Sequence, residues 1–163
     1  MFCSTRIGVV VSALWIAFSQ PVSARDVLEG PIPAKVTRVI DGDTVEVDAH
    51  IWPGQTVRVA VRLKGIDAPE IFRSSCAREK ALGADAKEYL VQLFEHDDAV
   101  SLFHIKEGKY AGRVVANIKT STGQEPAQDL ISNGLATTWA KRARANWCAD
   151  NVKNTKKIKT ARK

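Results

Sequence analysis

The stretch of sequence that decides the fold lies near the middle of the chain and is Val61-Arg62-Leu63-Lys64-Gly65-Ile66-Asp67-Ala68-Pro69-Glu70. Apolar and charged residues alternate through its first half, which predicts a β-strand that buries one face. Arg62 and Lys64 then share the face turned away from the core. Asp67 and Glu70 follow where the strand stops at a proline. A cation and two carboxylates so close together suit a metal and phosphate site.

A predicted hairpin precedes this strand. Asp41-Gly42 lies between β-branched stretches, which is a strong signal for a tight turn between two antiparallel strands. Pro53-Gly54 marks a second turn. The sequence therefore predicts three successive strands. Asp43, just past the first turn, adds a carboxylate that a barrel could bring beside Asp67.

Downstream, the hydrophobic period changes. Apolar residues at spacings of three and four predict a helix over 76–94, and strand patterns return over 99–105 and 113–118. A second helix is predicted over 127–135. Three strands, a helix, two strands and a helix fit a mainly β, α+β fold: a five-stranded Greek-key barrel of the OB type, with two to three helices.

The N-terminus has the layout of a secretory signal peptide: a short basic start, the apolar run 7–18 and a small-residue site ending at Ala24. We expect cleavage there, giving a secreted or periplasmic protein; the alternative is an uncleaved N-terminal anchor. The chain of 163 residues would then comprise signal peptide 1–24, lead-in 25–33, one domain over 34–150 and tail 151–163.

The positive charge of the chain is concentrated at its C-terminus. Lys and Arg number 24 against 18 Asp and Glu. The tail carries many of these cations and, from residue 153 on, no acid, so the domain is close to neutral. We expect a mobile tail able to hold a polyanion in a salt-dependent way; the alternative is a solvated terminus that aids solubility.

Two cysteines, Cys76 and Cys148, remain after the expected cleavage. In an oxidising compartment they allow one internal pairing, which would stabilise by about 4 kcal/mol on the chain-entropy estimate. The alternative is two unrelated buried thiols. A zinc site is disfavoured, because the chain has no Cys-x-x-Cys and its histidines are scattered.

Four segments in order resemble the thermonuclease (staphylococcal nuclease) family, and the resemblance extends over roughly residues 34–140. They are Val39 to Val45, Arg62 to Glu70, Tyr110-Ala111-Gly112-Arg113, and Asp129-Leu130 with Asn133-Gly134-Leu135-Ala136. The resemblance implies an OB-fold, calcium-dependent nuclease that acts on DNA and RNA. The two cysteines suggest a disulfide-bearing bacterial branch of that family.

The resemblance also implies a role for each matching residue. Asp43 and Asp67, with the carbonyl of Ala68, would hold Ca²⁺, although Ala68 stands where the prototype has threonine. Glu70 would act on water, and Arg62 and Arg113 would stabilise the phosphoryl transition state. The aromatic candidates for substrate binding are Tyr110 and Trp139.

Physical chemistry supports these roles independently. Calcium prefers carboxylate and carbonyl oxygens, and arginine grips phosphate oxygens in a forked geometry. The main rival interpretation is a non-catalytic OB module that binds nucleic acid or another polyanion, and a third is an exported structural or adhesion domain. A binder has no need of Glu70, both arginines and both aspartates together. We therefore expect a monomeric phosphodiester hydrolase.

Overall fold

The structure is a computed structural model that describes residues 27–139 and 145–149. The expected signal peptide and basic tail lie outside these residues. No helix within the described ranges is long and apolar enough to cross a membrane. The elements in chain order are β1 (Val27–Leu28), β2 (Ile32–Asp41), β3 (Thr44–Trp52), β4 (Gln55–Leu63), β5 (Ile66–Asp67), α1 (Ala77–His96), β6 (Ala99–Glu107), β7 (Arg113–Thr120), α2 (Pro126–Ser132) and β8 (Thr137–Thr138).

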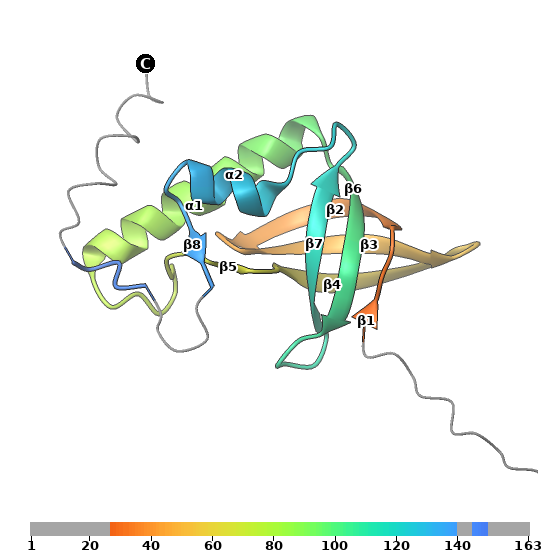
Figure 1. Cartoon of the computed structure of the whole chain (residues 1–163), viewed down its shortest axis with the longest axis horizontal. Coiled ribbons are helices and arrows are strands. Elements are labelled where there is room, and N and C mark those ends of the chain that lie inside the picture. The colour runs from red at the N-terminus through yellow and green to blue at the C-terminus, as the bar shows by residue number, and fades with distance from the viewer. Residues whose placement is uncertain (1–26, 140–144, 150–163) are drawn as a thin grey trace, which may run out of the picture.

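Five long strands close into a barrel. β2, β3 and β4 pair in sequence as antiparallel neighbours, and β6 joins the other edge of β2. β7 pairs with both β6 and β4, so the five strands form a closed barrel. In Figure 1, β6 and β7 cross the three-stranded meander, and α1 and α2 lie together at one end of it. The prediction of an α+β fold built on a five-stranded barrel is confirmed, with two helices in the described part.

One pairing in the barrel is parallel, between β4 and β7, with Ala60 opposite Arg113 and Arg62 opposite Val115. The other barrel pairings are antiparallel, as predicted. Residues opposite one another in a sheet project to the same face, and so do alternate residues of one strand. Arg62 and Arg113 therefore share the outer face of neighbouring strands.

The core is made of the inward face of each strand and one face of each helix. In β4, Val61 and Leu63 are almost completely buried, while Arg62 between them faces outward. α1 covers the barrel with Ala86 and Leu90, both fully buried. Alternation in the second half of β4 and the three-and-four spacing of the helix thus correspond to burial, as the sequence pattern predicts, whereas Val57 in the first half of β4 is 43% exposed.

The structure corrects three details of the sequence-based predictions. β2 begins at Ile32, before the expected start at residue 34. α2 ends at Ser132 rather than 135, because Asn133 caps it and Gly134 adopts a positive φ of 72° that ends the helix. The first hairpin turn is Gly42–Asp43, so Asp43 lies within the turn and not after it.

A disulfide joins Cys76, at the N-terminal end of α1, to Cys148 in the C-terminal segment. The two Cα atoms are 6.0 Å apart and the cysteines are separated by 72 positions in the chain. The predicted pairing is confirmed, and it is compatible with a location outside the cytoplasm.

Replacing both cysteines with serine should lower the free energy of unfolding by about 4 kcal/mol, because the bridge closes a long loop in the unfolded chain. Urea denaturation of the oxidised protein and of the double variant measures this difference. Dithiothreitol should destabilise the wild type and leave the double variant unchanged. A difference below about 1 kcal/mol would show that the bridge constrains the unfolded chain little.

Candidate active site

The first side of the site is the tight turn between β2 and β3, which carries Asp43. The backbone N–H of Asp43 donates to Oδ1 of Asp41 at 3.1 Å, an Asx-type contact that explains why Asp-Gly-Asp makes this turn. The hydroxyl of Thr44 donates to Oδ1 of Asp43 at 2.8 Å. The turn therefore holds the Asp43 carboxylate in a fixed direction, with only 4% of the residue exposed.

Arg62 on β4 links the two candidate metal ligands. Its guanidinium grips Asp43 with both ends of the fork, Nη1 to Oδ1 at 2.8 Å and Nη2 to Oδ2 at 2.7 Å. The same Nη2 lies 3.9 Å from Oδ1 of Asp67, which is itself 2% exposed. The structure thus brings together Asp43, Arg62 and Asp67, as the sequence predicts.

Burial of the Asp43 carboxylate is electrostatically unfavourable. Burial raises the pKa of Asp43 to about 7; Arg62 opposes this shift and Asp41 adds to it. A bound cation would offset part of the cost of burying both carboxylates. Within the described residues no three His, Cys, Asp or Glu side chains are grouped to hold a metal ion. A cation here would therefore have two carboxylates, with backbone carbonyl, water and phosphate oxygens completing its coordination.

Asp67 lies in β5, a two-residue strand that pairs with β8. Its Oδ2 accepts the backbone N–H of Ala145 at 3.4 Å. Ala145 belongs to the segment 145–149, which the disulfide ties to α1 through Cys148. Asp67 and Ala68 line a cavity of about 120 Å³ together with residues of this segment. Residues 145–148 therefore help to line the cavity beside Asp67 and Ala68.

Close packing against α1 brings the hairpin turn and the segment after β5 together. A Cβ on Gly42 would lie 2.8 Å from the Cβ of Ala86 and 3.2 Å from that of Ala68. A Cβ on Gly83 would lie 2.7 Å from the carbonyl oxygen of Pro69. Such distances leave no room for a side chain at either glycine. The small residues of α1 thus serve as a common platform for Asp43 and for the segment that leads to Glu70.

Glu70, the predicted catalytic carboxylate, lies in the loop between β5 and α1 and is partly exposed. Its backbone N–H lies 3.5 Å from Oε1 of Glu79 on α1. The residue therefore sits beside the cluster of Asp67 and Ala68, on a loop that α1 contacts twice, at Gly83 and at Glu79.

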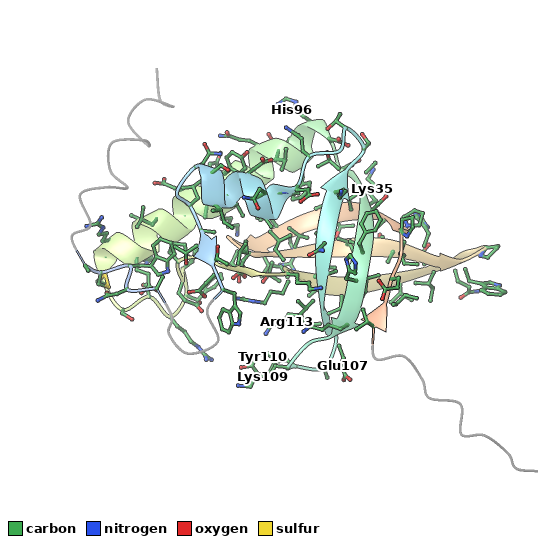
Figure 2. The ribbon with its side chains drawn as sticks, in the orientation of Figure 1. Lys35, His96, Glu107, Lys109, Tyr110 and Arg113 are labelled. Carbon is green, nitrogen blue, oxygen red and sulfur yellow. A yellow bond between two sulfur atoms is a disulfide. The ribbon has the colours of Figure 1, made fainter. Side chains whose placement is uncertain are left out.

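Arg113 is the first residue of β7, the strand that pairs in parallel with β4. Figure 2 shows it at one end of the barrel, beside the loop that carries Lys109 and Tyr110. Its guanidinium carbon lies 4.8 Å from the centre of the Tyr110 ring, a cation–π distance. Its Nε is buried and donates no hydrogen bond to any of the described residues. The Tyr110 ring thus packs against the Arg113 guanidinium.

The remaining aromatic candidate, Trp139, follows β8. Its backbone N–H donates to the carbonyl of Gly65 at 2.8 Å, so the residue is anchored near the start of β5. The side chain is 47% exposed, and that of Tyr110 is 58% exposed. Both side chains are therefore accessible to solvent, and the Tyr110 ring is in contact with the cations of Arg113 and Lys109.

Sequence reasoning missed the supporting residues Gly42, Gly83, Ala86 and Glu79. The glycines and the alanine matter through what lies opposite them in space. Glu79 carried a usable signal, because an acidic residue three positions after a helix N-cap is typical of a capping box. The cap residue here is cysteine instead of serine or threonine, so the sequence does not match the usual capping-box pattern.

Comparison with known proteins bears on the same part of the chain. The sequence model of the family described as staphylococcal nuclease homologue matches residues 60–163. The match includes the end of β4, the Asp67–Glu70 segment, α1 and the Arg113 strand. A search of curated proteins gave no match.

Proposed function

The chain belongs to the staphylococcal nuclease homologue family, and we propose that it is a calcium-dependent nuclease that hydrolyses phosphodiester bonds of DNA, RNA or both. The observation that carries this proposal is the contact of Arg62 with both Asp43 and Asp67. It joins a cation suited to phosphate with two buried carboxylates suited to a metal ion.

The donor set fits a hard divalent cation. Asp43 and Asp67 offer carboxylate oxygens, Ala68 offers a backbone carbonyl, and oxygen is the ligand that calcium prefers. When bound, calcium would supply positive charge beside the phosphodiester. Because the protein offers few ligands, we expect modest affinity for the ion in the absence of substrate.

Hydrolysis then needs a nucleophile and a way to stabilise the phosphoryl group. Glu70 would orient a water molecule and take its proton as the water oxygen attacks phosphorus and the ester P–O bond breaks; the ester oxygen would leave as the sugar hydroxyl after taking a proton from solvent. Arg62 and Arg113 project from the same outer face of adjacent strands, so their guanidinium groups can reach one phosphate from neighbouring positions. Their charge would stabilise the equatorial oxygens in the transition state.

The two exposed aromatic rings suit a nucleic-acid substrate. Stacking of a base on an aromatic side chain stabilises binding by about 1–3 kcal/mol and tolerates any sequence. Tyr110 lies beside Arg113 and Trp139 follows β8, so the two rings would contact different nucleotides of one strand. Unstacked bases are accessible in single strands, which favours a single-stranded segment as the preferred substrate.

Asp67→Asn should raise the calcium concentration needed for half-maximal cleavage by about tenfold or more, since it removes one of two charged ligands. Asp67 suits this test better than Asp43 because it is not held in the bidentate contact with Arg62. The rate at each calcium concentration can be followed with a quenched fluorescent oligonucleotide.

Asp48→Asn is the matched control. Asp48 is an aspartate of β3 that pairs with Arg58 away from the turn, and the variant should keep the wild-type calcium curve. Identical calcium curves for Asp67→Asn and wild type would remove Asp67 from the metal site. Cleavage by the wild type that persists in excess chelator would remove the calcium requirement itself.

A further inference from the structure

We propose that Glu79 is a positioning residue for Glu70: its carboxylate fixes both ends of the loop 70–75 and thereby sets where the Glu70 side chain stands. The inference rests on the proposed function, because it assigns Glu70 a role in hydrolysis. Glu79 itself touches neither substrate nor metal in this account.

The contacts of Glu79 span the loop. Its Oε2 accepts the backbone N–H of Ser75 at 2.6 Å, and its Oε1 receives the longer contact from the N–H of Glu70 at 3.5 Å. The residue is only 8% exposed. A buried carboxylate is costly unless hydrogen bonds compensate it, and here the donors are the backbone N–H groups of Glu70 and Ser75, both in the connection between β5 and α1. The loop therefore closes around this side chain.

The local sequence explains why a carboxylate stands at this point. Cys76 is the N-cap of α1, and its Sγ accepts the backbone N–H of Glu79 at 3.4 Å. In an ordinary capping box the acidic side chain returns to the N–H of the cap residue. Glu79 reaches past the cap instead, to Ser75 and Glu70. The positive end of the helix dipole favours its charge in this first turn.

The neighbourhood of Glu79 connects it to the rest of the site. Glu79 and Ser75 line the same cavity of about 120 Å³ as Asp67 and Ala68. The loop is also pressed against α1 at Gly83, where the Pro69 carbonyl and the Ile71 side chain leave no room for a Cβ. Two residues of α1 thus contact the chain around Glu70. Gly83 packs closely against Pro69 and Ile71, and Glu79 accepts the backbone N–H groups of Glu70 and Ser75.

The competing interpretation is that Glu79 only caps the helix and stabilises the fold. A cap would affect melting temperature, but it would not change kcat selectively at a temperature where the protein is folded. Glu79→Gln is the sharpest variant, because it keeps the shape and one acceptor oxygen while replacing the other oxygen with a donor. Glu95→Gln, an exposed glutamate later on the same helix, is the matched control.

For Glu79→Gln we expect kcat to fall about 10- to 100-fold, the usual cost of removing an outer-shell partner. KM and the calcium dependence should stay within about twofold of wild type, because Arg62, Asp43 and Asp67 are held by the barrel. In the Glu70→Ala background the same change should cause no further loss. Glu95→Gln should match the wild type in every measurement.

Amide hydrogen exchange gives a readout that does not depend on cleavage. In Glu79→Gln the amides of Glu70 and Ser75 should exchange about tenfold faster than in wild type, while those of the barrel strands should not change. Unchanged exchange at both amides, or a loss of kcat that multiplies with that of Glu70→Ala, would overturn the inference. If the wild type cleaves nothing, the nuclease proposal fails by itself, and the exchange data still decide whether Glu79 fixes the loop.

Discussion

Glu70→Gln should lower kcat for phosphodiester cleavage by about 10²- to 10⁴-fold, the range that a positioned general base contributes. Glutamine keeps the size of the side chain and can still contact a water molecule, but it cannot accept a proton from it. Because the size of the side chain is kept, the variant should remain folded at the assay temperature, which a thermal melt checks. Single-turnover cleavage of a labelled oligonucleotide at saturating calcium measures the chemical step directly.

The control for this experiment is again Glu95→Gln, which removes one glutamate charge from an exposed position on α1 and should cleave at the wild-type rate. Calcium and substrate binding by Glu70→Gln should remain close to wild type, since the side chain is not among the expected ligands. A rate within twofold of wild type would show that another group acts on the water.

Arg113→Ala should lower kcat by about 10²- to 10³-fold, the cost of removing one preorganised donor from a developing charge. The guanidinium of Arg113 lies over the Tyr110 ring, and its buried Nε has no acceptor among the described residues, so no carboxylate there is shown to neutralise it. Arg113→Lys should recover only part of the loss, because lysine presents a point charge without the fork.

Arg58→Ala provides a matched control for Arg113. Arg58 projects from the same outer face of β4 as Arg62, but it forms an exposed pair with Asp48 at 2.8 Å. Exposed pairs contribute little to stability, so the variant should fold and cleave like the wild type. Equal losses for Arg58→Ala and Arg113→Ala would indicate a general effect of surface charge and would remove the specific role of Arg113.

Much of the barrel could be predicted from sequence because its signals are local. Alternation in the 57–64 stretch determines which face of β4 is buried, and Asp41-Gly42 marks the hairpin before it. The three-and-four spacing of apolar residues identified α1 to within two residues at each end. Each of these signals depends on neighbours in the chain, which is where propensity and periodicity act.

The parts that were missed depend on contacts between distant segments. The parallel pairing of β4 with β7 places Arg62 and Arg113 on the same face of adjacent strands. No local sequence pattern predicts that pairing. The buried position of Glu79 depends on where the loop 70–75 folds back over α1. The sequence predicts Asp43 just after the turn because Asp-Gly is itself a turn signal, whereas in the structure Gly42–Asp43 form the turn and the Asp41 side chain accepts the backbone N–H of Asp43.

In the candidate site, too, some features follow from the local sequence and others depend on contacts between distant segments. The residue types and spacing around Arg62, Asp67 and Glu70 predict phosphate and metal chemistry, and this stays a prediction. The arrangement that makes the chemistry feasible comes from α1, whose Gly83 and Ala86 allow two separate segments to approach one helix. Those residues carry no chemical signal, so only the folded structure reveals their contribution.

The most direct test of the central claim compares wild type and Glu70→Gln on single-stranded DNA, duplex DNA and RNA, with calcium and with excess chelator, using the oxidised protein. We predict cleavage that requires both calcium and the Glu70 carboxylate. Binding of these nucleic acids without cleavage under any condition would contradict it, and would mean that the barrel is a binding module that retains the residues of a nuclease site.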